Sequence, residues 1–427
     1  MKRIWKILLS ITVVVGIFIA FVYLSVSETE ATFRTCKIIY PTEIGNINFR
    51  EFDSVTVSAN TIYQASGFKE FMQGEQYRDA WTQPVTVPIA YLDTLKGGLK
   101  IIEEGGGKQT HSLELEDGTG IRYALRSLSK DPSKLVPDVA KKLGLENIVV
   151  DGVSAQHPYA ALVVSKLSQA ANVLHTHPKL IFVPKQETLG ELNEKYGNRL
   201  YFFEYESEGE VDWTGIKNVK ELIDTDDLQE LRMEKGSEIT IDKKELIKAR
   251  LFDILIGDWD RHAKQWGWAM VKKDNGFLAI PVPTDRDNAF FKQDGVLPTL
   301  ITNDLTLPKV QEFEEKIDFL PGLVRPFDEY FLRTATLEQF REAAKYLKQK
   351  LTDEVIIDAF NAWPKEVDSL DGPEIRNKII ARRDHLVQYA EEFYRTLEQR
   401  PKEPIILSGS EDLELEGSLN NCFDCDI

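Results

Sequence analysis

Two acidic clusters in the second half of the chain carry the side chains that phosphate chemistry uses. The first cluster follows an apolar stretch that breaks at Gly257, and it contains Asp258 and Asp260. The second cluster contains Asp285 and Asp287. In phosphoryl transfer one carboxylate orients the attacking hydroxyl group, and others hold a divalent cation against the phosphate oxygens. If the fold brings the two clusters together, they supply both kinds of group.

The segment between the clusters predicts a β-hairpin that would do this. Residues 266–271 and 277–282 are predicted strands, and the turn contains Asp274, Asn275 and Gly276. Asn-Gly between two apolar runs is a strong hairpin signal. Because the first strand begins after one cluster and the second strand ends at the other, both clusters should lie at one edge of a sheet.

A helix must present the first cluster. The sequence predicts that it starts at Thr240 or Asp242, since either side chain can accept a hydrogen bond from the first turn, and that it ends at Ile256. Apolar residues at helical spacing form its buried stripe: Leu246, Ile247, Phe252, Ile254 and Leu255.

Upstream, the sequence predicts a β-meander with strands at 99–104, 110–115 and 121–128. The loop between the first two strands is rich in glycine and consists of Gly105, Gly106, Gly107, Lys108 and Gln109. Its backbone N–H groups could approach phosphate oxygens without obstruction by side chains, although a flexible hairpin without a ligand is the alternative. The third strand carries Arg126, with Lys130 at its end as a second basic candidate.

The flanking segments predict further elements. Strands are expected at 84–88, 180–184 and 200–205, and helices at 134–143, 154–172, 327–333, 337–350, 353–361 and 373–399, with an irregular stretch at 291–320. Asp151 and Gln156 are candidate polar partners for Arg126. His175 and His177 are predicted to lie in a solvated loop, because no third metal ligand is near them in the sequence.

The central motif resembles the catalytic segment of atypical protein-kinase-like enzymes. Asp260-Arg261-His262, then Gln265 five residues after Asp260, and then Asp285 followed by Phe290 match the pattern of this group. The group includes HipA-type kinases, CotH-type spore coat kinases, the secretory-pathway casein-kinase family and phosphoinositide kinases. The resemblance implies an α+β, two-lobed kinase-like fold, with a small antiparallel β lobe and a larger helical lobe. It also implies phosphoryl transfer from ATP to a hydroxyl acceptor on a protein, sugar or lipid.

The same resemblance assigns roles to residues. Asp260 would be the catalytic aspartate, while Gln265, Asp285 and Asp287 would bind the metal, which is Mg²⁺ or Mn²⁺ because the ligands are oxygens. ATP would contact the glycine-rich loop and Arg126. Arg261 and His262 would brace the catalytic loop.

Two other functions remain open. The chain could be a catalytically weak kinase-like module that binds nucleotide or a partner, since Arg126 and Gln265 depart from the lysine and asparagine of the group. It could also be a metal-dependent phosphohydrolase that uses both acidic clusters and His262. A hydrolase would more typically contain additional histidines, and the chain has only 6.

The N-terminus predicts a membrane anchor. Lys2, Arg3 and Lys6 precede an apolar run from Ile7 to Val26, and a run of roughly 20 residues suits a helix that spans a bilayer. The basic flank should stay in the cytoplasm, so the folded domain should be extracytoplasmic, on a periplasmic or lumenal side. A cleaved secretion signal is the alternative.

Composition sets the remaining limits. A net charge of −17 argues against a nucleic-acid partner. The 3 cysteines, Cys36, Cys422 and Cys425, do not make a disulfide framework. The acidic end of the chain is expected to be a frayed tail or a remnant strand.

The predicted organisation is a cytoplasmic stub at 1–6, an anchor at 7–27, a tether and N-terminal arm at 28–74, a β lobe at 75–210, a helical lobe at 211–405 and an acidic tail at 406–427.

Overall fold

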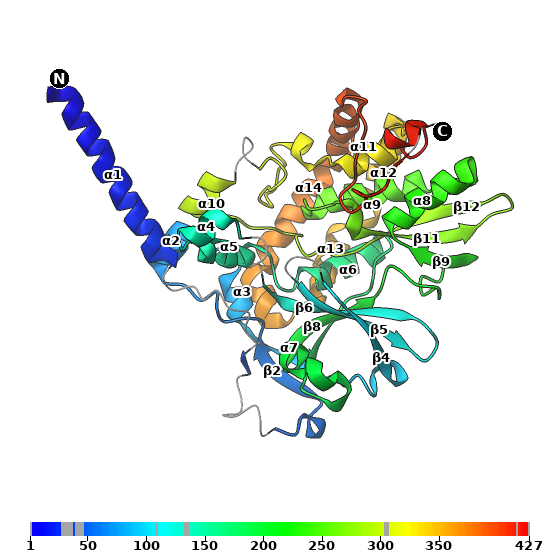
Figure 1. Cartoon of the computed structure of the whole chain (residues 1–427), viewed down its shortest axis with the longest axis horizontal. Helices are drawn as coiled ribbons and strands as arrows, with labels where there is room; N and C mark the ends of the chain where they lie inside the picture. The colour runs from blue at the N-terminus through cyan, green and yellow to red at the C-terminus, as the bar shows by residue number, and fades with distance from the viewer. Residues whose placement is uncertain are drawn as a thin grey trace.

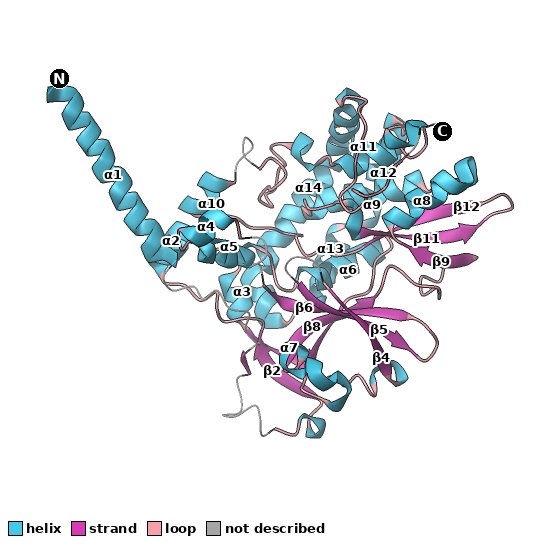
Figure 2. Ribbon diagram, in the orientation of Figure 1, coloured by secondary structure: helices cyan, strands magenta, loops and turns pink. Residues whose placement is uncertain are grey.

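The computed structural model of the chain describes residues 2–26, 37–38, 47–106, 110–131, 136–302, 307–415 and 417–425. Within these residues the fold is mixed α and β, with strands in three sheets and a larger part built from helices (Figures 1 and 2). Helix α1 (Lys2–Val26) projects from one side of the molecule (Figure 1).

The predicted meander is part of a five-stranded antiparallel sheet with the order β4-β5-β6-β8-β7. Its strands are β4 (Leu99–Gly105), β5 (Thr110–Asp117), β6 (Arg122–Lys130), β7 (Lys179–Val183) and β8 (Arg199–Tyr205). All five strands were expected from the sequence, with bounds that agree to within about two residues, as is usual for element ends.

The predicted hairpin is also confirmed. Strands β11 (Trp266–Lys272) and β12 (Phe277–Pro283) pair antiparallel, with Trp266 opposite Pro283. They belong to a four-stranded sheet with the order β10-β12-β11-β9, in which β9 (Val219–Ile223) is antiparallel to β11 and β10 (Ile239–Ile241) is parallel to β12.

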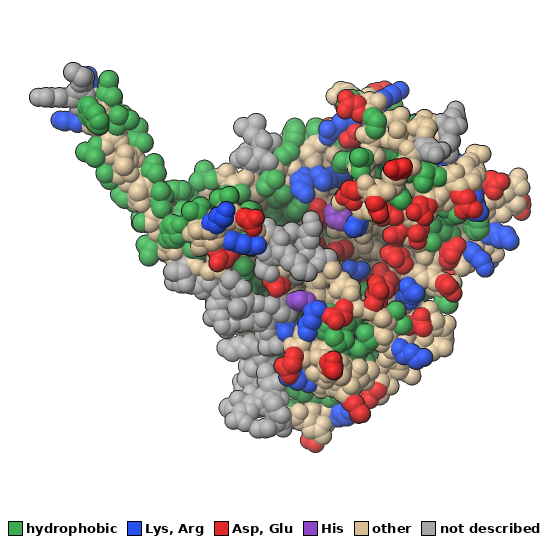
Figure 3. All heavy atoms as spheres, in the orientation of Figure 1, with side chains coloured by type: hydrophobic (Ala, Val, Ile, Leu, Met, Phe, Trp, Pro, Cys, Tyr) green, Lys and Arg blue, Asp and Glu red, His purple; other side chains and the backbone are tan. Residues whose placement is uncertain are grey.

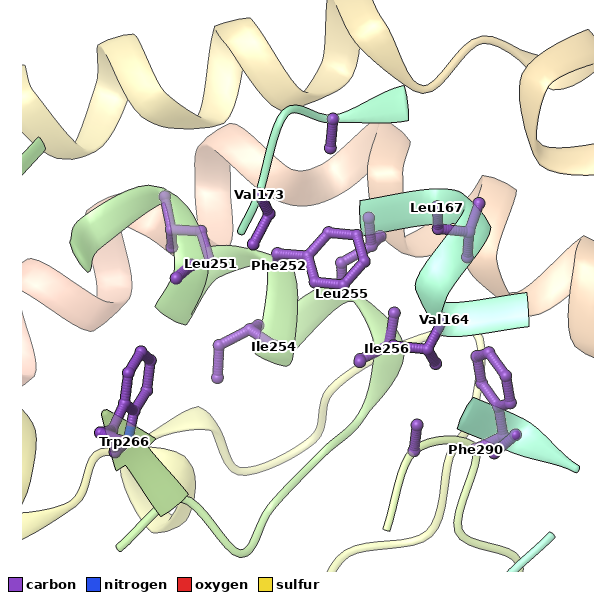
Figure 4. Close-up of a cluster of buried hydrophobic side chains, with 14 of the residues drawn as sticks. Val164, Leu167, Val173, Leu251, Phe252, Ile254, Leu255, Ile256, Trp266 and Phe290 are labelled. Atoms are coloured by element: carbon purple, nitrogen blue, oxygen red, sulfur yellow. The ribbon is translucent and has the colours of Figure 1, made fainter. Parts of the chain in front are cut away.

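Helix α9 (Lys243–Ile256) presents the first acidic cluster, as predicted. Asp242 caps it by accepting a hydrogen bond from the Glu245 backbone N–H at 3.1 Å. The helix ends at Gly257, where φ is +72° and a Cβ atom would lie 2.6 Å from the Phe313 ring, so only glycine suits the position. Its apolar side chains fill the main core (Figure 4).

Together with α9, the other helices that follow β9 form the larger part of the molecule. They are α8 (Thr225–Lys235), α10 (Val296–Ile301), α11 (Pro326–Leu332), α12 (Leu337–Lys350), α13 (Asp353–Ala359) and α14 (Lys365–Gln399). The predicted start of the last helix at 373 is wrong, because α14 begins eight residues earlier and continues through Pro373. Val367 and Ile375 are both buried on either side of the proline, so packing outweighs the helix-breaking tendency of proline.

The predicted helices beside the meander are shorter than expected. The structure has α4 (Asp138–Lys142), α5 (Glu146–Gly152) and α6 (Ala160–Ala170) there, and α7 (Asn193–Tyr196) before β8. Residues 134–135 of the first predicted helix lie outside the described residues.

Residues 47–74, which the sequence suggested to be part of a tether and arm, are folded. Strands β1 (Lys37–Ile38), β2 (Ser54–Ser58) and β3 (Pro84–Pro88) form the third sheet, and α2 (Gly67–Gln73) and α3 (Arg78–Thr82) follow β2. Tyr77, Arg78 and Trp81 are buried, so they pack this N-terminal part of the chain onto the rest of the fold.

The prediction of a frayed acidic tail is wrong for the described residues. Leu419, Cys422 and Phe423 are buried, and a disulfide joins Cys422 to Cys425. The Phe423 N–H donates to the Tyr330 carbonyl at 3.0 Å, and its carbonyl accepts from Arg232 Nε at 3.0 Å. The prediction rested on the acidic composition of the segment. Composition does not show that one aromatic side chain, Phe423, is buried and holds the segment against the domain.

Helix α1 is long and apolar enough to cross a membrane, judged by length and composition only. A signal sequence at the N-terminus would pass the same test.

Candidate functional site

A pocket between the five-stranded sheet and the end of the β11–β12 hairpin brings basic and acidic side chains together. Arg126 and Lys130 line it from β6, and Asp285 and Asp287 line it from the residues after β12. Thr110, the first residue after the glycine-rich loop, also lines this pocket. Thr110, at the start of the strand that follows the glycine-rich loop, and the second acidic cluster therefore line one pocket.

The glycine-rich loop is described only at its first two residues. Gly105 ends β4, and Gly106 follows with φ of +110°. Gly107, Lys108 and Gln109 lie outside the described residues, so their predicted phosphate contacts stay predictions. In the β5–β6 ladder Thr110 pairs with Lys130, which places the end of the loop beside a basic side chain of the pocket.

The second acidic cluster has unusual electrostatics. Burial would raise the pKa of Asp285, but Arg126, Lys130 and Arg261 outweigh it and lower that pKa below its usual value. Burial raises the pKa of Asp287 to about 6, with a further contribution from the charge of Asp285. Lys130 Nζ forms an ion pair with Asp287. Two neighbouring carboxylates thus face a buried ammonium group. A divalent cation bound there would supply the positive charge that Lys130 supplies in its absence.

The first cluster lies close to the second. Burial lowers the pKa of His262, and the charges of Asp260 and Asp285 oppose that shift. The Thr284 N–H donates to the Gln265 carbonyl at 3.0 Å, which continues the hairpin ladder between the two clusters. The side chain of Asp260 is 25% exposed, and Lys309 Nζ lies 3.7 Å from it. Asp260 is thus the accessible carboxylate of its loop.

A buried network that the sequence did not reveal holds both clusters in place. Asp253 of α9 lies 3.2 Å from Arg261 Nε and 2.9 Å from Arg286 Nε. Arg261 follows Asp260 in the chain, and Arg286 lies between Asp285 and Asp287. A third arginine, Arg250, contacts Asp253 at 3.0 Å and also pairs with Asp328. One carboxylate therefore fixes the backbone beside each acidic cluster. In the sequence, the sign of this network is a single aspartate, Asp253, among the apolar residues of α9.

Arg261 has the bracing role that was predicted for it. Its guanidinium donates to the Thr284 carbonyl at 2.7 Å and to the Gln265 carbonyl at 3.1 Å, and it stacks over Trp266 at 4.7 Å. Asp258 is buried 3.5 Å from Arg261; burial raises the pKa of Asp258, and Arg261 opposes that shift.

The side chain of Gln265, a predicted metal ligand, is hydrogen-bonded to Arg261. Its side-chain carbonyl accepts a hydrogen bond from Arg261 Nη1 at 3.0 Å, which leaves one lone pair of that oxygen for a metal. Asn288 is the amide that contacts the acidic cluster: its Nδ2 donates to Asp287 at 2.9 Å, and its Oδ1 accepts from Gln156 at 2.6 Å. An asparagine three residues after Asp285 was visible in the sequence but had no predicted metal role.

The carboxylate partners of Arg126 come from β8 and the residue that follows it, and not from Asp151 or Gln156. Arg126 Nε lies 2.9 Å from Glu204, and its Nη2 lies 3.6 Å from Glu206. Asp151 is instead buried against Lys69 and Arg78. Antiparallel pairing of β6 with β8 sets Arg126 opposite Phe202, so Glu204 is its diagonal neighbour on the same face of the sheet.

The prediction of a solvated loop holds for His177, which is exposed, and is wrong for His175. His175 is only 7% exposed and lines the same pocket. Burial lowers the pKa of His175 to about 3, so the ring is neutral at physiological pH.

The donor set fits a cation that is bound together with phosphate. In the part of the chain that the structure describes, no group of three or more His, Cys, Asp or Glu side chains is arranged to hold a metal alone. Mg²⁺ at nucleotide sites usually takes one or two carboxylates, with phosphate oxygens and water as its other ligands. Asp285 and Asp287 fit that requirement.

Comparisons with known proteins add little. No protein-family model and no curated protein matches the sequence. Among solved structures, the Helicobacter pylori proinflammatory kinase CtkA is similar with a TM-score of 0.36 and 14% identity, over 71% of this chain and 97% of CtkA. Shewanella oneidensis HipA, from a toxin–antitoxin complex with HipB and operator DNA, is similar with a TM-score of 0.32 and 11% identity, over 69% of this chain and 67% of that chain. Likenesses at this level carry no argument about function.

Proposed function

We propose that the chain is a kinase-like phosphotransferase that moves the terminal phosphoryl group of ATP to a hydroxyl acceptor. One observation carries the proposal: Arg126 and Lys130 of the five-stranded sheet line the same pocket as Asp285 and Asp287 after the hairpin. Cations that grip phosphates and carboxylates that hold Mg²⁺ or Mn²⁺ are the two halves of a phosphoryl-transfer site.

The residues would divide the work as follows. Asp285 and Asp287 would bind the metal, which neutralises charge on the phosphates when it is bound. Lys130, released from Asp287, would turn to the phosphates, and Arg126 would add a second positive charge. Asp260 would orient the acceptor hydroxyl. As the acceptor oxygen bonds to the γ-phosphorus, the bond from that phosphorus to the bridging oxygen breaks, ADP leaves, and the acceptor proton passes to Asp260.

The test is transfer of radiolabelled phosphate from γ-labelled ATP by the full chain in detergent, with Mg²⁺ and with protein, sugar and lipid acceptors. Asp260→Asn should lower the rate roughly 10²- to 10⁴-fold, the usual contribution of a positioned proton acceptor. Asp285→Asn should abolish metal-dependent transfer. Asp384→Asn is the control, because that carboxylate is 50% exposed in an ion pair on α14. Unchanged transfer by Asp260→Asn would refute the proposal.

A second function, nucleotide binding without transfer, is supported by a different observation. Gln265 is bonded to Arg261, Arg126 is paired with Glu204, and Lys130 is paired with Asp287. Lys130 would have to leave Asp287 before it could bind phosphate. Under this alternative, ATP with Mg²⁺ raises the unfolding temperature but no acceptor is labelled. Release of free phosphate without any acceptor would instead indicate the phosphohydrolase.

We also propose that α1 anchors the folded domain outside the cytoplasm, with a cleaved secretion signal as the alternative. The basic residues Lys2, Arg3 and Lys6 before the apolar run support this orientation. Carbonate extraction of membranes, followed by protease treatment of intact and opened compartments, tests it: the full chain should stay with the membrane and be digested only from the extracytoplasmic side.

A further inference from the structure

The C-terminal end of α1 packs against the folded domain. Val22, Ser25 and Val26 are buried. Gln73 Nε2 of α2 donates to Ser25 Oγ at 2.9 Å, and Tyr23 Oη donates to the Leu143 carbonyl at 2.9 Å. The direction of α1 is therefore fixed relative to the domain.

The helices at this junction form one packed unit. Val22 of α1, Met72 of α2 and Leu297 of α10 make a small separate core. Phe21 meets Phe68 edge-to-face with ring centroids 5.4 Å apart. In Figure 1, α2, α4 and α10 lie beside the base of α1, on the side that faces the rest of the domain.

These three short helices also expose large apolar side chains. They are Phe68 (38% exposed), Phe71 (63%), Val139 (68%), Leu143 (51%), Leu300 (59%) and Ile301 (48%). Figure 3 shows apolar surface that continues from α1 onto this part of the domain. Exposed apolar side chains gathered on three adjacent helices mark an interaction surface, because scattered single ones would need no explanation.

The length of the exposed apolar stretch of α1 indicates that a lipid bilayer covers this surface. Apolar side chains are exposed along α1 from Ile4 to Leu24, a stretch of about 31 Å at 1.5 Å per residue. That length is close to the roughly 30 Å thickness of a bilayer hydrocarbon core. If the exposed part of α1 lies in the bilayer, the boundary of the hydrocarbon falls near Leu24, at the level where α1 contacts the three short helices.

We infer that α2, α4 and α10 form a collar that sits in the interfacial layer of the membrane that α1 crosses. The collar side chains enter the boundary between headgroups and acyl chains, as amphipathic interfacial segments do. Lys141 and Lys142 of α4 are exposed beside them and face lipid phosphates. The inference rests on α1 lying in a bilayer and is independent of the proposed phosphotransferase activity.

The test uses the full chain reconstituted in vesicles of phosphatidylcholine and phosphatidylglycerol that contain a trace of a phosphatidylcholine with a diazirine on its acyl chain. After illumination, mass spectrometry maps the labelled residues. Labels are expected in α1 and also in α2 and α10. Labels confined to α1 would overturn the collar, and absence of label in α1 would overturn it too, because α1 would then lie outside the bilayer.

A double variant adds a second measurement. Phe71→Glu with Leu300→Glu should lower labelling of α2 and α10 roughly tenfold, which corresponds to about 1.4 kcal/mol of lost membrane interaction, and should leave labelling of α1 unchanged. Ile406→Glu is the matched control, because Ile406 is 72% exposed on the C-terminal segment. All three positions are exposed, so the unfolding temperatures should stay the same. Equal labelling of the collar in the double variant and the control would contradict the inference.

Discussion

Replacing Asp253 by asparagine tests the network that holds the two acidic clusters together. The carboxylate contacts Arg250, Arg261 and Arg286 at 2.9–3.2 Å, and all four side chains are at most 5% exposed. Arg250 keeps Asp328 as a partner, so the loss falls mainly on Arg261 and Arg286. Removing one partner of a buried ion pair costs about 3–5 kcal/mol, because the remaining charge stays buried without compensation. We expect a loss of that order in the free energy of unfolding.

Urea unfolding of the full chain in one detergent, followed by tryptophan fluorescence, measures this loss. Asp384→Asn is the control, because its exposed pairs with Arg383 and Lys348 are worth only about 0–1 kcal/mol. At a temperature where both variants are folded, Asp253→Asn should also impair phosphoryl transfer, since both acidic loops lose their support. If Asp253→Asn were as stable as Asp384→Asn, Asp253 would not organise the site.

Four further outcomes are expected. Burial raises the pKa of Asp287 to about 6, so the affinity for ATP with Mg²⁺, measured by calorimetry, should fall as the pH falls through 6, and Asp287→Asn should remove this dependence; a pH profile shared with the variant would exclude Asp287 as a ligand. Burial lowers the pKa of His175 to about 3, so below about pH 6.5 the unfolded chain binds a proton that the folded chain does not, and stability should fall by up to about 1.4 kcal/mol per pH unit. Urea unfolding of His175→Gln should show a flatter acid limb than wild type, and identical limbs would contradict burial of a neutral ring. Lys130→Ala should weaken ATP binding in a filter assay and should raise the pKa of Asp287, seen as an upward shift of the pH profile; unchanged binding would indicate that Lys130 only balances charge. Cys422→Ser with Cys425→Ser should lower the free energy of unfolding by roughly 2 kcal/mol, as expected for a short closed loop, and should abolish the effect of a reductant on the unfolding temperature; a reductant effect that persisted would have another source.

The sequence determined those parts of the site that depend on neighbours along the chain. Asn275-Gly276 between apolar runs specified the hairpin, and Asp242 and Gly257 specified where α9 begins and ends. These signals are readable because caps, turns and periodic stripes are local, and each acts within a few residues.

Only the tertiary structure decided which charges meet. Lys130 and Asp287 are 157 residues apart in the sequence, and no local pattern pairs them. The role of Asp253 depends on two arginines from different loops, and the packing of Phe423 depends on a surface formed by Tyr330 and Arg232. The reason is physical: a buried charge or ring is stabilised by whichever groups the whole fold places around it, and those groups come from segments whose approach the local sequence does not encode.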